Sequence, residues 1–232
     1  LIETMINGVD DKIDSYLFSA IDNLITHFVP IFSSLMVVWV VIWGYMTMFG
    51  YSQEPLKEGV SRIIKLGFIL TLGLTATTYY NVVGNFLLEA PNEIGAIITG
   101  STNYTAGGSL DALYRKVFDA ADEAWEQGGV MNGNFGMYIL ALIIALFGGG
   151  LVLATISLVI ISKVALAVVV ALGPIAISLI LFQSTQRFFE SWLGQCLNLG
   201  LVFILATGVA SLIVGVGDTF ISRNNDPDLN DV

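Results

Sequence analysis

Long stretches without any charged residue are the strongest constraint on how this chain can fold. Its 19 acidic and 9 basic side chains leave five charge-free windows, at residues 23–53, 66–88, 127–162, 164–186 and 191–217. A helix needs about 20 apolar residues to cross the hydrocarbon core of a bilayer. Each window is long enough, and five such windows are far more than a soluble core requires. We therefore expect an all-α, polytopic transmembrane protein with about five spans.

The polar segments between these windows predict a division of the chain into five parts. These are an N-terminal amphipathic helix at 1–26, the first two spans at 27–88 with a cytoplasmic loop at 51–65, and an external loop subdomain at 89–134 with a short helix. The last three spans at 135–217 and a polar C-terminal tail at 218–232 follow.

Apolar residues recur every three or four positions through the first segment, which is the spacing of one helix face. They are Ile2, Ile6, Val9, Ile13, Tyr16 and Ala20. Two interpretations stay open: the helix lies on the membrane surface, or it packs against a partner helix.

The second window is the most polar of the five. On one helix its Thr71, Thr75, Thr78 and Asn85 would share a face. Such side chains commonly bond across helix pairs, so helix contact is the first interpretation. The alternative is a polar lining for a wet path.

Residues 135–182 contain a single charge, Lys163. One straight helix of that length would measure about 70 Å, which exceeds the bilayer. We expect a turn at Ser162–Lys163; the alternative is a long bent helix followed by a half-span, with Gly148–Gly150 and Gly173–Pro174 as the candidate bend points. Lys163 either reaches the interface with its ammonium group or lies deeper at a functional position.

Basic residues in short loops mark the cytoplasmic side of a membrane protein. The cluster Lys57, Arg62 and Lys65 therefore places 51–65 in the cytoplasm, with the N-terminus and the segment 89–134 outside and the C-terminus cytoplasmic. Within the external segment, which the family resemblance described below would place in the periplasm, we expect a loop over Thr99–Ser109 and a helix over Leu110–Gln127 with Ser109 as its N-cap.

No residue pattern points to catalysis, to a cofactor or to a metal. Phosphate-binding glycine loops, cysteine pairs and zinc-binding histidine motifs do not occur in the sequence. His27 is expected to be structural, and Asp119, Asp122 and Glu126 to form a solvated helix face. The net charge of −10 argues against a basic nucleic-acid surface. We expect a protein that is not an enzyme.

The stretch 163–198 resembles a known family. A basic residue opens it, followed by an alanine-rich apolar run, a proline, a phenylalanine and an aromatic-rich link that ends in tryptophan; these positions are Lys163, Pro174, Phe182, Arg187 and Trp192. The pattern is similar to the polytopic inner-membrane subunit of bacterial type IV secretion systems, the TrbL-like, sixth VirB-type component. The layout of spans and external segment is similar as well.

The resemblance implies a homo-oligomeric ring in the bacterial inner membrane, beneath a periplasmic stalk. Such a ring would aid translocation of DNA or protein cargo and pilus assembly in conjugation. It implies contacts with stalk and pilin subunits, other inner-membrane secretion subunits, ATPases and membrane lipid. The five residues above would then act structurally or in subunit contacts. The alternatives are a free-standing channel or transporter for ions or small solutes, and a membrane anchor for another complex.

Overall fold

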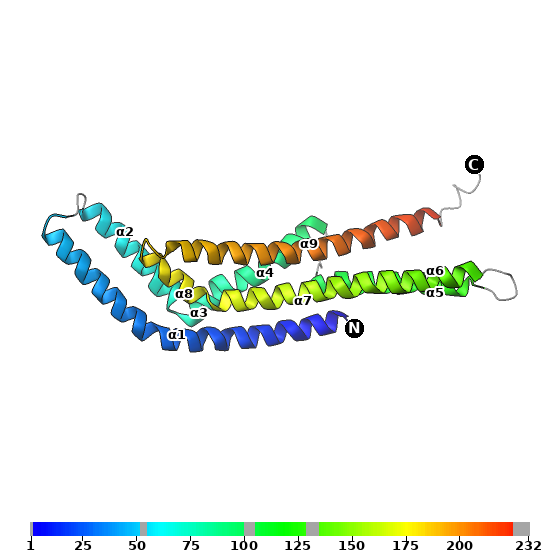
Figure 1. Ribbon diagram of the computed structural model, residues 1–232, viewed down its shortest axis with the longest axis horizontal. Coiled ribbons are helices and arrows are strands. Elements are labelled where there is room, and N and C mark those ends of the chain that lie inside the picture. Colours follow the sequence, from blue (N-terminus) through cyan, green and yellow to red (C-terminus); the bar gives the residue numbers. More distant parts are fainter. Residues whose placement is uncertain (1, 52–54, 100–104, 129–134, 225–232) are drawn as a thin grey trace. The chain divides into compact units, whose positions relative to one another are not determined.

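A computed structural model describes residues 2–51, 55–99, 105–128 and 135–224, and these residues form helices and short turns without a strand (Figure 1). The α-helices in chain order are α1 (Ile2–Met48), α2 (Pro55–Phe68), α3 (Ala76–Tyr79), α4 (Asn85–Thr99), α5 (Ala106–Glu126), α6 (Phe135–Ile143), α7 (Gly149–Ala171), α8 (Gly173–Ser178) and α9 (Gln186–Asn224). Three π-helical turns, η1 (Ile69–Gly73), η2 (Tyr80–Gly84) and η3 (Ile144–Gly148), and one 3-10 turn, η4 (Leu179–Leu181), connect some of them.

Among the described residues, three helical stretches are long and apolar enough to cross a membrane: Ile2–Met48, Phe135–Ala171 and Gln186–Val216. A fourth candidate consists of Gly59–Gly73 and Ala76–Ile97, which meet at an angle of 87°. The prediction of a multi-span, all-helical protein is confirmed, and about five spans is roughly compatible with these three or four.

The turn expected at Ser162–Lys163 is wrong. Helical structure runs without a break from Phe135 to Ala171, through α6, η3 and α7. The interruption comes at Gly173–Pro174, because proline has no N–H group with which to continue the helix. The short segment α8 then follows, so the structure has the long helix and half-span of the alternative interpretation.

The second expected span differs from the prediction in two ways. Residues 55–65, predicted as loop, belong to α2, which starts at Pro55, a residue that suits the first turn of a helix. The span itself bends between η1 and α3, where Thr75 has an extended backbone. The helix that would have carried one polar face over 66–88 is therefore divided.

The chain forms two compact units, and several helices contribute to both. The first unit comprises residues 1–11, 90–164 and 200–232. Its apolar core draws on the start of α1, on α5, on α7 and on α9, with buried Ile2, Ile6, Leu110, Leu113, Val152, Val159 and Phe203.

The second unit comprises residues 12–89 and 165–199. Its core includes Leu17, Ile21, Ile25 and Phe32 from α1, together with Ile69, Tyr79, Val170 and Ile177. Leu17 is buried whereas Tyr16 is exposed, so the predicted apolar face of residues 1–26 is shifted by one position at this point. The predicted N-terminal helix is continuous with the first span.

Candidate functional site

The break after α7 alters the hydrogen bonding of two backbone carbonyl groups, and that of Val169 still accepts from the Leu172 amide, at 3.2 Å. In a regular helix the carbonyl of Val170 would accept from the amide of residue 174, but Pro174 has no such donor. The Tyr79 hydroxyl donates to this carbonyl at 2.5 Å, and the indole Nε1 of Trp192 donates to the carbonyl of Val169 at 2.7 Å. Unsatisfied carbonyls are costly within a membrane, so these side chains stabilise the break.

Gly173 is required by this arrangement. A Cβ atom at this position would overlap the Tyr79 hydroxyl and come within 2.8 Å of the Trp192 ring. Tyr79 is fully buried, so it has little room to move. Gly173 therefore allows two side chains from distant parts of the sequence to reach the carbonyls of Val169 and Val170.

Phe182 forms the next turn, between the half-span and α9. Its carbonyl accepts hydrogen bonds from the amides of Thr185 and Gln186, each at 3.1 Å, and its ring packs against the core of the second unit. Arg187 is exposed in the first turn of α9, and within the described residues its side chain has no ion pair. Pro174, Phe182 and Trp192 thus come together in one unit.

Lys163 lies in the other unit and is paired. Its Nζ atom is 2.6 and 2.7 Å from the two carboxylate oxygens of Asp10 in α1, and 5.3 Å from the ring centre of Phe203 in α9. The Lys163 side chain is 12% exposed and that of Asp10 is 40% exposed. An opposite charge and an aromatic face compensate the largely buried ammonium group, which allows α7 to continue through this position.

The four polar residues of the second span do not form the expected single stripe. The hydroxyl of Thr71 donates to the carbonyl of Gly67 at 2.6 Å, and that of Thr75 to the carbonyl of Leu70 at 3.1 Å. Both hydroxyls therefore bond within their own segment. Thr78 and Asn85, both half-buried, lie beyond the bend. A role as lining or helix contact stays a prediction.

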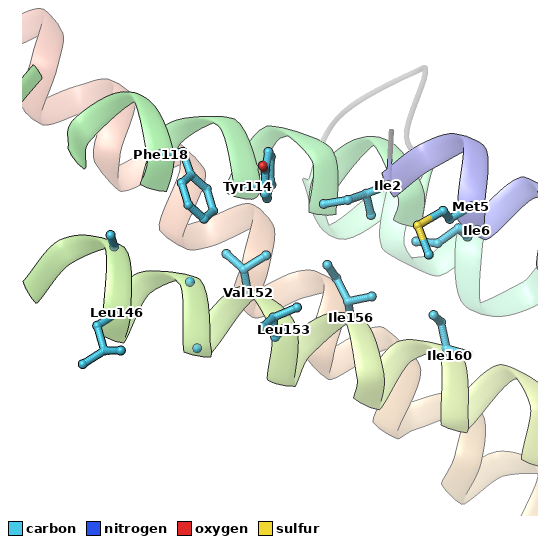
Figure 2. A pocket seen from close by; sticks show the side chains of 13 residues that line it. Ile2, Met5, Ile6, Tyr114, Phe118, Leu146, Val152, Leu153, Ile156 and Ile160 are labelled. Carbon is cyan, nitrogen blue, oxygen red and sulfur yellow. The ribbon is translucent and has the colours of Figure 1, made fainter. Parts of the chain in front are cut away.

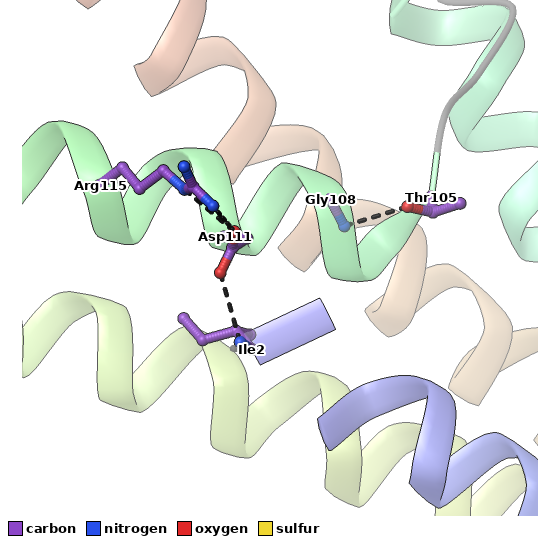
Figure 3. Close-up of polar contacts among 5 residues, drawn as sticks. All are labelled: Ile2, Thr105, Gly108, Asp111 and Arg115. Carbon is purple, nitrogen blue, oxygen red and sulfur yellow. Dashed lines mark hydrogen bonds and ion pairs between the residues drawn. The ribbon is translucent and has the colours of Figure 1, made fainter. Parts of the chain in front are cut away.

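Helix α5 begins with a side-chain cap. Thr105, not Ser109, is the N-cap, and its hydroxyl oxygen accepts a hydrogen bond from the Gly108 amide at 3.0 Å (Figure 3). The sequence prediction missed the cap because the glycines at 107 and 108 were taken as loop. Gly107 allows this first turn of α5 to lie close to α1, because an added Cβ there would be 3.1 Å from the backbone of Glu3.

Asp111 connects α5 to the start of α1. Its carboxylate accepts from the Ile2 amide at 3.3 Å and from the Arg115 guanidinium at 3.1 Å (Figure 3). Desolvation works to raise the pKa of Asp111, but the hydrogen bonds and positive charge around the carboxylate outweigh it and hold the pKa below its ordinary value. The carboxylate is therefore ionised at neutral pH and holds the two helices together.

An apolar groove of about 570 Å³ lies in the first unit, between the start of α1, helix α5 and helix α7 (Figure 2). Its lining includes Met5, Tyr114, Phe118, Leu146, Leu153 and Ile160. The groove offers no charged side chain for acid–base chemistry. Nor do the described residues contain a group of three or more histidine, cysteine or acidic side chains that could hold a metal ion.

Sequence reasoning missed Tyr79 and Asp10 as contributors and named Gly173 only as part of a bend point. The Gly173–Pro174 pair was a usable signal, because a proline in a helix always frees the carbonyl four residues earlier. Nothing in the sequence indicates which buried donor satisfies that carbonyl. Asp10 was one of several acids on an amphipathic helix, so the pattern did not distinguish it as the partner of Lys163.

These features define a class: a multi-pass helical membrane protein whose polar contacts fix helices in place. The model of the TrbL/VirB6 plasmid conjugal transfer protein family matches residues 36–232. The chain therefore belongs to the TrbL/VirB6 family, and the resemblance at 163–198 is confirmed. Membership of this family makes the chain a multi-pass inner-membrane component of a type IV secretion system, with other secretion subunits as partners.

Curated relatives agree with this assignment. The type IV secretion system protein VirB6 of Bartonella henselae is 26% identical over 228 residues, which cover 90% of this chain and 68% of the relative. The protein PtlD of Bordetella pertussis is 24% identical over 206 residues, covering 85% and 44%. Protein VirB6 of Agrobacterium fabrum is 22% identical over 184 residues, covering 76% and 59%.

Proposed function

We propose that this protein is an inner-membrane structural and conduit subunit of a type IV secretion machine for conjugation. Copies of the chain form a ring beneath the periplasmic stalk and aid substrate translocation and pilus assembly. The observation that carries the proposal is the family match over residues 36–232. The chain has no catalytic role in it, and separate ATPases supply the energy.

The exposure of the spanning helices supports an assembly role. In the most apolar part of the three long candidate spans, only 11%, 17% and 28% of the residues are buried within the chain. Such surfaces need lipid or other protein as neighbours. In this proposal, other copies of the chain cover part of these surfaces. The path for the translocated substrate then lies between subunits.

The external segment 89–134 supports contacts outside the membrane. Its helix α5 exposes Tyr114 and Trp125, aromatic residues of the kind that protein interfaces favour. We assign to it the contacts with stalk and pilin subunits, in an orientation with the N-terminus periplasmic and the C-terminus cytoplasmic. DNA or protein cargo would pass only transiently.

A conjugation assay tests the proposal. A donor strain lacking this gene is complemented with the wild-type chain, with Tyr79→Phe, Trp192→Ala or Pro174→Ala, or with Tyr45→Phe as an exposed control. We expect transfer and pili to be lost on deletion and restored by the wild type and by Tyr45→Phe. Trp192→Ala should reduce the assembled complex on a native gel more than it reduces the amount of protein in the membrane.

Unchanged transfer in the deletion strain would contradict the secretion role. The next measurement would then be ion conductance of the purified chain in liposomes, since a free-standing channel conducts without other subunits. Normal assembly of both Trp192→Ala and Pro174→Ala would contradict the structural role of the α7 break alone.

A further inference from the structure

A positively charged side chain lies against two tryptophan rings in the second unit. The guanidinium carbon of Arg62 in α2 is 4.6 Å from the ring centre of Trp39 and 5.5 Å from that of Trp43, both in α1. Within the part of the chain that the structure describes, no carboxylate pairs with Arg62. A guanidinium carries five N–H donors, so stacking on the rings leaves these donors available.

An unused hydrogen-bond donor lies beside this cation. The indole Nε1 of Trp43 is buried and has no acceptor, one of only two such side-chain atoms among the described residues. Gly59 of α2 contacts the same ring, and an added Cβ there would be 3.3 Å from it. The ring is therefore held against α2, with its N–H donor near a cation and without an acceptor of its own.

The level of the site in the membrane follows from the helices. Trp43 lies five residues before the end of α1 at Met48, which is about 7 Å along the axis. Tryptophans prefer the headgroup region, and arginines near helix ends extend toward it. An acceptor that supplies negative oxygens at this level is the phosphate of a phospholipid.

Apolar side chains on the same helix suit the rest of a lipid. Val60, Ile63 and Ile64 of α2 are 57%, 68% and 66% exposed. They lie within two residues of Arg62, and Lys65 adds a second positive charge one turn further on. The segment thus combines cations for a phosphate with exposed methyl groups for acyl chains.

We propose that Arg62 and Trp43 form a binding site for the phosphate group of an anionic phospholipid. The Arg62 guanidinium and Trp43 Nε1 donate hydrogen bonds to phosphate oxygens, and Val60, Ile63 and Ile64 contact the acyl chains. Charge-assisted hydrogen bonds of this kind give the site its preference for an uncompensated phosphate. A choline headgroup carries its own cation, which Arg62 and Lys65 repel, so phosphatidylcholine binds less well.

The test is a lipid titration of the full chain in detergent, followed by native mass spectrometry. The probes are phosphatidylglycerol, phosphatidylcholine and inorganic phosphate as competitor. Arg62→Gln removes the cation, and Trp43→Phe removes the indole N–H while keeping a ring. Arg115→Gln is the matched charge control, because Arg115 lies exposed on α5 in the other unit. Thermal unfolding shows that each variant is folded.

We expect both site variants to weaken phosphatidylglycerol binding about tenfold, the effect of one charge-assisted hydrogen bond. Arg115→Gln should leave binding unchanged, and phosphatidylcholine should bind more weakly to the wild type. Equal phosphatidylglycerol binding by the wild type, Arg62→Gln and Trp43→Phe would overturn the proposal. Displacement of the lipid by inorganic phosphate would identify a free-phosphate site and overturn the assignment to lipid.

Discussion

Two side-chain donors bond to backbone carbonyls at the end of α7. The carbonyls of Val169 and Val170 face this break, and the side chains that satisfy them come from α3 and α9. The donors are a hydroxyl and an indole N–H. Only the hydroxyl can be removed with almost no change in the volume of the side chain, by Tyr79→Phe.

Tyr79→Phe is expected to lower the free energy of unfolding by about 1 to 3 kcal/mol, because it leaves the Val170 carbonyl buried without a donor. Unfolding in detergent by titration with sodium dodecyl sulfate measures the change. Tyr45→Phe, at a 60% exposed position, is the control and should have no effect. An equally small effect of both variants would show that the Val170 carbonyl does not need the hydroxyl.

The ion pair in the first unit predicts an asymmetry between its two partners. Asp10→Asn leaves the more buried ammonium of Lys163 without a counter-charge, whereas Lys163→Met leaves a carboxylate that water reaches. We expect Asp10→Asn to cost about 2 kcal/mol and Lys163→Met less, since exposure of Asp10 screens the pair. The double variant should recover part of the loss. Additive losses would contradict a direct interaction.

At the scale of elements, the geometry of the half-span depends on one glycine. Gly173→Ala is expected to prevent normal packing of α8, because the added methyl group overlaps the Tyr79 hydroxyl. Gly194→Ala is the matched control in the same unit, since nothing lies within 4 Å of its added Cβ. Yield of monodisperse protein after detergent extraction measures the difference. Equal yields would contradict the close approach at Gly173.

The contact between α1 and α5 predicts a dependence on pH. The pKa of Asp111 is lowered in the folded protein, so its stabilisation is complete above the unfolded pKa, about 3.9. It is lost as the pH falls through the lower, folded pKa. The thermal midpoint of Asp111→Asn should therefore lie below that of the wild type at pH 7, and the difference should disappear near pH 2. A difference that persists in acid would contradict this role of the carboxylate.

At the scale of the whole molecule, the proposed orientation makes a prediction about labelling. In a Cys196→Ser background, a membrane-impermeant maleimide should label Asp122→Cys on α5 in cells with a permeable outer membrane. Tyr51→Cys, at an exposed position after α1, should be labelled only once the inner membrane is broken. The reverse pattern would invert the topology.

Charge-free windows were sufficient to predict the all-helical, multi-span class, because burial in lipid constrains composition strongly. They were not sufficient to place breaks. Lys163 looked like the end of a span, but Asp10 compensates its charge, and this contact joins residues far apart in the sequence. The bend at Thr75 directly follows the π-helical turn η1, which packs against α8. No local sequence pattern encodes this contact between distant segments.

The family pattern named Pro174, Phe182 and Trp192, and the structure places all three in the second unit, at the break after α7 and the turn that follows it. It could not supply Tyr79, since a donor for a freed carbonyl is defined by geometry and not by spacing. Arg187 was included in the pattern, and its exposed position leaves its role a prediction.

The break after α7 also has a consequence for how the chain enters the membrane during synthesis. Tyr79 leaves the ribosome well before Gly173, but Trp192 follows it by 19 residues, and the turn at Phe182 lies between them. When α7 first reaches the insertion machinery, the carbonyl of Val169 has no tryptophan to bind. We expect α8 to settle in the bilayer only after the beginning of α9 has emerged, so that these last two elements integrate together as one hairpin.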